Sequence, residues 1–151
     1  MKIFNSDFEM QLRILLLLSQ TRRALSKEEI IDLDFITIYS ADFGIGTDNL
    51  HGDNHFKYGE FASRQELAWN AIRRLVVEGS IVVVTSDGFS YKISAEGLKY
   101  ANSLESTYSM DYRETVRQVL QKYFNYSEKD FSSEIDKRAI ESVRRTEPCT
   151  T

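Results

Sequence analysis

The sequence of 151 residues has almost none of the features that mark an exported or membrane-spanning protein. Cys149 is its one cysteine, so no disulfide can form within a single chain. The longest apolar run, residues 14–18, is far too short to cross a bilayer, and the first residues lack the pattern of a signal peptide. These absences predict a cytoplasmic protein without membrane contact.

Positive charge is also scarce for a protein that binds nucleic acid. Lys and Arg number 19 against 23 Asp and Glu, which gives a net charge of −4 and a pI near 5.3. DNA-binding domains usually present a basic face. The acidic balance therefore weakens the case for DNA binding, although an uneven distribution of charge could still provide a basic patch.

Motifs that carry catalysis are missing as well. Asp42-Phe43-Gly44 matches the magnesium-binding tripeptide of kinases, but no kinase catalytic loop accompanies it and the chain is too short. Gly44 and Gly46 lack the third glycine of a dinucleotide-binding fingerprint, and there is no Walker motif. Cys149 stands in a polar tail that offers nothing to activate a thiol. We expect no catalytic residues and no bound cofactor, and hence no enzyme.

Candidate metal ligands gather only between residues 41 and 60. His51 and His55 are four residues apart, and three aspartates are close in sequence (Asp42, Asp48 and Asp53). Two imidazoles and a carboxylate could bind zinc or another transition metal. No HExxH or paired CxxC motif supports such a site, and polar loop residues commonly bond to their own backbone. We therefore expect no metal.

Residues 81–93 carry the clearest structural signal. Asp87-Gly88 stands between the apolar run of residues 81–84 and an alternating segment of residues 89–93. Asp-Gly between two such runs predicts a β-hairpin, because glycine adopts the positive φ that the turn requires.

Helical periodicity dominates the rest of the chain. Ser6, Ser26 and Ser63 each have a glutamate three residues later, the pattern of an N-terminal capping box, and Gly79 fits the end of the third helix. In the last helix apolar residues are sparse, so we expect it to be loosely packed or packed on something other than its own chain. The predicted helices cover residues 6–19, 26–39, 63–78, 94–104, 111–124 and 127–145.

The order of these elements predicts a mainly α protein with a small β-hairpin (α+β class) and a winged helix-turn-helix core. The core spans residues 1–126 and includes a long Gly/Asp/His loop at residues 41–60, where no helical or strand period survives. Residues 127–151 form a C-terminal helical extension and tail.

A winged helix could contact DNA through its third helix and its wing. The third helix offers Arg64, Arg73 and Arg74, and the wing offers Lys92. Acidic residues nearby offset most of this charge, so arginines on a solvated helix face are the simpler interpretation. Arg22, Arg23 and Lys27 near the second helix could add to a basic patch, which keeps open the alternative of an autonomous transcriptional regulator.

Three short motifs stand out between the second and third helices: Asp42-Phe43-Gly44, Asn49-Leu50-His51 and Tyr58-Gly59-Glu60. Together with the apolar first helix and Ala95-Glu96-Gly97 after the wing, they resemble the middle-component subunits of bacterial ABC three-component systems. These systems include the Lamassu type of anti-phage defence. The resemblance spans roughly residues 8–120.

The resemblance implies a non-catalytic accessory subunit. Such a subunit would bind an SMC- or Rad50-like ABC ATPase and an effector nuclease encoded beside it, in a complex that acts against phages or plasmids. A third possibility combines this subunit with the regulator: DNA passes through the assembled complex and touches Arg73 or Arg74 only there. The resemblance also implies that the motif segment helps to form the contact with the ATPase or shapes the domain. The residues concerned are Asp42, Phe43, Gly44, Asn49, Leu50, His51, Tyr58 and Glu60.

Overall fold

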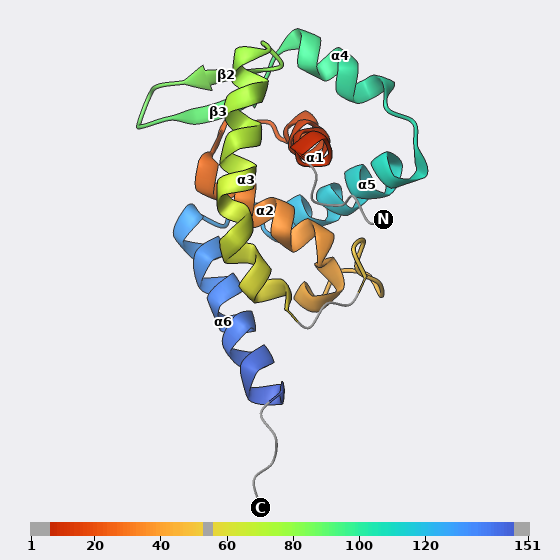
Figure 1. Cartoon of the computed structure of the whole chain (residues 1–151), viewed down its shortest axis with the longest axis vertical. Coiled ribbons are helices and arrows are strands. Elements are labelled where there is room, and N and C mark those ends of the chain that lie inside the picture. Colours follow the sequence, from red (N-terminus) through yellow and green to blue (C-terminus); the bar gives the residue numbers. More distant parts are fainter. Residues whose placement is uncertain (1–6, 53–55, 147–151) are drawn as a thin grey trace, which may run out of the picture.

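A computed structural model describes residues 7–52 and 56–146, and within them the chain forms six α-helices, a 3-10 turn and a three-stranded antiparallel sheet (Figure 1). The predicted α+β class is confirmed. The elements in chain order are α1 (Asp7–Gln20), β1 (Leu25–Ser26), α2 (Lys27–Ile38), η1 (Ser40–Phe43), α3 (Lys57–Val77), β2 (Ile81–Val84), β3 (Ser90–Ile93), α4 (Ala95–Ser103), α5 (Thr107–Lys122) and α6 (Glu128–Thr146).

Helix α1 lies at the centre of the molecule. In Figure 1 it is seen end-on, with α2, α3, α4 and α5 arranged around it, and it contacts all four. Its run from Ile14 to Leu18 is completely buried, as the apolar composition predicts. The predicted cap Ser6 lies outside the described residues.

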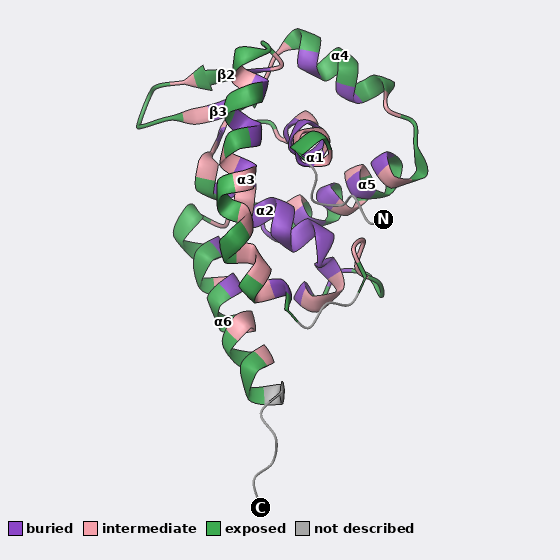
Figure 2. Ribbon diagram, in the orientation of Figure 1, coloured by how far each residue is buried: buried purple, intermediate pink, exposed green. Residues whose placement is uncertain are grey.

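Helix α2 begins with the predicted capping box. The Ser26 hydroxyl accepts a hydrogen bond from the Glu29 backbone N–H (3.1 Å), and the Glu29 carboxylate accepts one from the Ser26 backbone N–H (3.1 Å). The helix continues to Ile38 through a β-branched and aromatic segment, because these side chains are buried against α1 and α5. Almost every residue of α2 is buried, as Figure 2 shows.

The prediction of a long loop over residues 41–60 is wrong at both ends of this range. Its start forms the 3-10 turn η1, and its end belongs to α3, which begins at Lys57 instead of Ser63. Tyr58 and Phe61 pack on the ring of Phe35, with ring centroids 5.6 and 4.7 Å away, and this packing extends the helix through a glycine-containing segment. Ser63 is no cap, since its hydroxyl donates to the Glu60 carbonyl (2.9 Å) within the helix.

The predicted hairpin is confirmed, and a third strand joins it. Strand β3 pairs with β2 on one side and with the short β1 on the other, with Leu25 opposite Tyr91. Gly79 ends α3 with a φ of 79°: its N–H donates to the Val76 carbonyl, and the next N–H donates to the Leu75 carbonyl.

Helices α5 and α6 cover the core by packing on α2, and α5 also contacts α1. Helix α5 starts at Thr107, four residues before the predicted start, because Ser106 caps it by accepting from the Ser109 N–H (3.1 Å). Helix α6 packs through Phe131 and Ile135 on its first turns, so this half is bound to its own chain, mainly to α2. Its last turns project beyond the body (Figure 1). In the described part of the chain, no helix has both the length and the apolar character to cross a membrane.

Candidate partner-binding site

The first two motifs, Asp42-Phe43-Gly44 and Asn49-Leu50-His51, come together in a compact turn at the end of α2. The Asn49 side chain links the two halves of this turn: its Oδ1 accepts from the Ala41 backbone N–H (2.8 Å), and its Nδ2 donates to Oδ1 of Asp42 (3.4 Å). The Asn49 side chain thus holds the second motif against the first. We call residues 40–51 the motif turn.

Side chains from three helices hold the motif turn in place. The Asp42 carboxylate forms an ion pair with Lys57 at the start of α3. The Phe43 carbonyl accepts a hydrogen bond from Lys122 of α5, and the Asp42 carbonyl accepts one from Arg138 of α6 (2.9 Å). The motif turn is therefore the place where α3, α5 and α6 are tied together.

Phe43 fills the space inside this arrangement, and Gly44 makes the turn that follows it. The Phe43 ring is fully buried, lies edge-on to Phe35 (centroids 6.1 Å apart) and is covered by the Arg138 guanidinium at 5.6 Å. Gly44 has a φ of 78°, and a Cβ there would lie 3.1 Å from the Lys122 Nζ. A side chain at this position would strain the backbone and crowd the lysine.

The second motif reaches α5 through His51. Its Nε2 lies 2.7 Å from the Tyr108 hydroxyl, while Leu50 packs partly buried against the core. Burial, followed by the nearby Arg13 guanidinium, lowers the pKa of His51 from 6.5 to about 3. The imidazole is therefore neutral at physiological pH.

The third motif packs as part of α3. Tyr58 lies against Phe35, and Glu60 forms an ion pair with Arg64 one turn later on the same helix. Gly97, from the motif after the hairpin, is also fixed by packing: it leaves no room for a side chain, because a Cβ there would lie 2.0 Å from the Ser80 carbonyl oxygen. In the folded chain the family motifs thus make intramolecular contacts. Their assignment to a partner interface stays a prediction.

A buried ion pair lies beside the motif turn, and sequence reasoning missed it. Arg13 of α1 donates from Nε and Nη2 to the two carboxylate oxygens of Asp34 on α2, at 2.9 and 3.0 Å. The Tyr112 hydroxyl of α5 donates to the same carboxylate at 2.7 Å. An arginine inside the most apolar helix was the available signal, because a buried charge requires a partner.

The three bonds set the charge state of this pair. Burial alone raises the pKa of Asp34, but the Arg13 guanidinium and the Tyr112 hydroxyl outweigh it and hold that pKa below its usual value. Burial raises the pKa of Tyr112 well above its ordinary value, with the Asp34 charge adding to the effect. Arg13, Asp34 and Tyr112 therefore form a fixed, charge-neutral connection between α1, α2 and α5.

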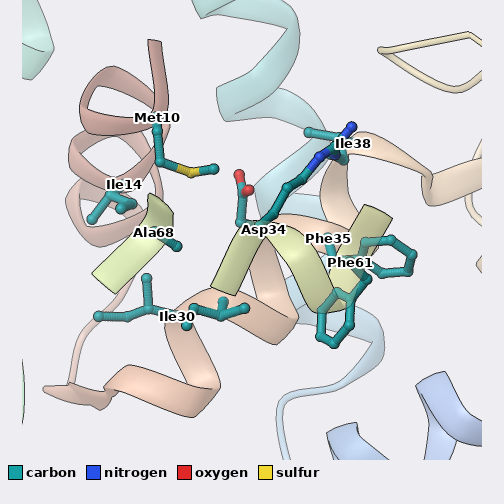
Figure 3. Close-up of a pocket in the computed structure, with 10 residues that line it drawn as sticks. Met10, Ile14, Ile30, Asp34, Phe35, Ile38, Phe61 and Ala68 are labelled. Carbon is teal, nitrogen blue, oxygen red and sulfur yellow. The ribbon is translucent and has the colours of Figure 1, made fainter. Parts of the chain in front are cut away.

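A small cavity adjoins this ion pair between α1, α2 and α3. Figure 3 shows the Asp34 carboxylate among apolar side chains that include Met10, Ile14 and Phe35. The volume is about 20 Å³, which has room for one water molecule and for no larger ligand.

The four candidate DNA contacts do not form one patch. Arg64 is mostly buried and paired with Glu60, whereas Arg73 and Arg74 lie near the other end of α3, on its exposed face. The Arg73 guanidinium lies over the Trp69 ring at 5.5 Å and also bonds the Asn70 side chain. Lys92 is exposed on β3.

The histidines and aspartates that were considered as metal ligands are likewise not grouped. Among the residues that the structure describes, no three His, Cys, Asp or Glu side chains are grouped so that they could hold a metal ion. Asp42 and His51 bond instead to Lys57 and Tyr108. His55, Asp53 and Cys149 lie outside the described residues.

Comparison with known proteins gives one result. No curated protein and no solved structure matches the chain. A family model matches residues 3–145, and its description is ABC-three component (ABC-3C) system Middle Component 2. The match covers nearly the whole chain and both sides of the motif turn. The chain therefore belongs to the family of Middle Component 2 proteins of ABC three-component systems.

Proposed function

We propose that this chain is a non-catalytic accessory subunit that binds the ABC ATPase and the effector nuclease of its three-component system. The family match over residues 3–145 is the observation that carries this proposal. The contacts of the motif turn support the non-catalytic part of the proposal, because Asp42, Asn49 and His51 are engaged by side chains and backbone of their own chain. The ATPase would be of the SMC or Rad50 type, and the complex a Lamassu-type defence system in the cytoplasm.

We also infer that the core is a winged helix. The order α1, β1, α2, α3, β2, β3, with β1 beside β3, supports this inference. In this arrangement β2 and β3 are the wing and α3 is the helix that other winged helices place on DNA.

An exposed aromatic side chain supports an interface on the C-terminal helices. Phe124, just after α5, is 82% exposed and borders a groove with Arg22 and Arg117. Exposed aromatic and arginine side chains often anchor protein–protein interfaces. We propose that this groove is covered when the complex forms.

An autonomous DNA-binding regulator is less well supported. Because Arg64 is paired with Glu60, only Arg73, Arg74 and Lys92 remain as exposed cations of the original four. Three phosphate contacts give weak, strongly salt-dependent binding. We propose that Arg73 and Arg74 touch DNA only within the assembled complex.

Co-purification with the products of the neighbouring genes tests the function. The tagged chain should elute with the ATPase in size-exclusion chromatography at micromolar concentration. Phe124→Ser should weaken the association, whereas Phe89→Ser, which changes another largely exposed aromatic residue on the hairpin, should not. A chain that elutes alone while the other subunits associate would contradict the proposal.

Fluorescence anisotropy with duplex DNA over a salt series tests the alternative. We expect absent or weak binding by the isolated chain. Tight binding that falls steeply with salt and loses its specificity in Arg73→Ala would favour the regulator.

A further inference from the structure

A groove with three helical walls lies on the side of the molecule where α6 meets α2 and the first half of α3. Its lining residues recur about one turn apart on each helix, so that each helix presents one face to the groove. Helix α2 contributes Lys27, Glu28, Ile31 and Asp32, α3 contributes Phe61 and Gln65, and α6 contributes Glu128, Lys129, Ser132 and Asp136.

Asp32 is the buried acidic group of this groove. Only 8% of the residue is exposed, and no hydrogen bond or ion pair to its carboxylate is found among the residues that the structure describes. Burial, followed by the nearby charges of Glu128 and Glu28, raises the pKa of Asp32 to about 7. The carboxylate lies at the surface of the groove, and a charge with so little access to water and no partner is costly unless something binds it.

The groove as a whole is negatively charged. Four carboxylates line it against two ammonium groups, those of Lys27 and Lys129. Lys27 is already engaged, because its Nζ lies 4.8 Å from the centroid of the Trp69 ring and 3.8 Å from a Glu28 carboxylate oxygen. The groove therefore attracts a cation from outside the chain.

The shape and lining of the groove favour an arginine side chain over a metal ion. Within the described segments, no three acidic or histidine side chains are close enough to hold a metal. Ile31 and Phe61 provide an apolar wall against which an aliphatic stem can lie, as the stems of long basic side chains do. A guanidinium has five N–H donors, and one carboxylate accepts only some of them. The side-chain oxygens of Gln65 and Ser132 are available to accept hydrogen bonds from the remaining donors.

One face of α6 continues the groove beyond its lining residues, far enough to contact a segment of a partner protein. The stripe of Glu128, Ser132 and Asp136 continues at the same spacing to Ile140, which is 54% exposed. Figures 1 and 2 show the last turns of α6 projecting from the body with mostly exposed residues. An acidic pocket next to an exposed apolar side chain on one helix face matches a partner segment that carries both a basic and an apolar residue.

We propose that this groove receives an arginine side chain of a partner protein in the three-component complex, with Asp32 as its charge partner. The partner segment then runs along α6 toward Ile140. This inference rests on the proposed function for the existence of the partner, and it specifies where on the chain that partner binds.

Binding of the purified ATPase subunit to the full chain tests the proposal. In isothermal titration calorimetry, Asp32→Asn should weaken binding by at least about tenfold, because it leaves a desolvated guanidinium unpaired. Asp87→Asn, in the exposed hairpin turn, is the matched control and should bind like the wild type. If Asp32 were needed only for folding, its substitution would lower the stability of the free chain as well as its binding. We expect instead that the free Asp32→Asn chain is at least as stable as the wild type. If the wild type binds and Asp32→Asn binds equally well, the groove proposal fails and the proposed function stands.

A second measurement does not require the partner. The side-chain carboxyl ¹³C signal of Asp32 is followed by NMR while N-acetyl-arginine amide is added to the full chain, with the uncharged N-acetyl-citrulline amide as control. The arginine compound should shift the signal and lower the pKa of Asp32, and citrulline should not. An equal response to the two compounds, or a larger response to magnesium chloride, would overturn the proposal even if the subunit joins the complex.

Discussion

Asp32 and Asp34 stand two residues apart on α2, and their surroundings are opposite. Both are more than nine-tenths buried, with 8% and 6% of the residue exposed. Asp34 points inward to Arg13 and Tyr112, whereas Asp32 lies about 200° around the helix and lines the acidic groove. The pKa of Asp34 is lowered and that of Asp32 is raised.

The comparison shows that burial alone does not decide the cost of a charge. Desolvation is the largest single influence on the pKa of either aspartate. The partners then determine the outcome: a guanidinium and a hydroxyl face Asp34, and carboxylates surround Asp32. The inner aspartate belongs to the fold, and the outer one is available to a ligand.

Removing the inner partner should have the largest effect. Arg13→Ala leaves the Asp34 charge buried and should lower the free energy of unfolding by about 3–5 kcal/mol. Urea denaturation at pH 7, followed by circular dichroism, measures this. The control is Arg117→Ala, which breaks an exposed ion pair with Glu114 and an exposed hydrogen bond to Gln20 and should cost about 1 kcal/mol or less. Similar losses in the two variants would contradict the assignment of Asp34 to a buried ion pair.

Removing the outer charge should raise the free energy of unfolding instead of lowering it. Because the pKa of Asp32 is raised, the protonated carboxyl stabilises the fold at low pH, and this contribution is lost as the pH rises toward 7. Asp32→Asn should match the wild type near pH 4 and exceed its free energy of unfolding by about 2 kcal/mol at pH 8. Urea denaturation at pH 4, 5.5 and 8 follows the difference. A variant that is less stable at pH 8 would show that Asp32 has a structural partner.

A smaller effect should come from removing one hydrogen bond to the inner aspartate, Asp34. Tyr112→Phe removes one of the three hydrogen bonds to Asp34 and keeps the ring, so it should cost about 1.5 kcal/mol at pH 7. Tyr100→Phe, on the exposed side of α4, should leave the free energy of unfolding unchanged. Equal effects of the two substitutions would mean that the Tyr112 hydroxyl does not contribute to holding the carboxylate.

The smallest effect at neutral pH concerns His51. Its pKa is lowered to about 3, so its contribution to stability is complete above pH 6.5 and is lost as the pH falls toward 3. Between about pH 4 and 6.5 this trend opposes that of Asp32. In Asp32→Asn, the free energy of unfolding should therefore rise with pH over this range, more steeply than in the wild type.

NMR titration of the His51 ring measures the pKa directly, with His51→Gln to assign its signal. The imidazole should remain neutral down to about pH 4.5. A midpoint near 6.5 would show that the contact with Tyr108 does not exclude solvent.

Local signals in the sequence predicted part of this fold. The Asp-Gly turn, the Ser26 capping box and Gly79 each act within a few residues, and all three are confirmed. The first turns of α3 were missed because their helical conformation depends on packing against Phe35, more than twenty residues earlier. Short-range propensity and spacing do not contain that contact.

The two aspartates illustrate the same limit for the site. Their spacing on α2 places them on opposite faces, but the partner of Asp34 is 21 residues away on α1, and another is 78 residues away on α5. The acidic neighbours of Asp32 on α6 are more than ninety residues away in sequence. The family motifs were recognisable, whereas their internal contacts required the folded chain.

The attachment of the motif turn has a consequence for comparing relatives of this chain. Lys122 and Arg138 bind the main-chain carbonyls of Phe43 and Asp42, and every amino acid supplies a carbonyl. Replacement of the turn's own side chains therefore leaves these two acceptors intact, while a change of the lysine or the arginine removes a donor. Alignments centred on the turn would overlook half of the anchor, which is encoded some eighty to ninety-five residues downstream.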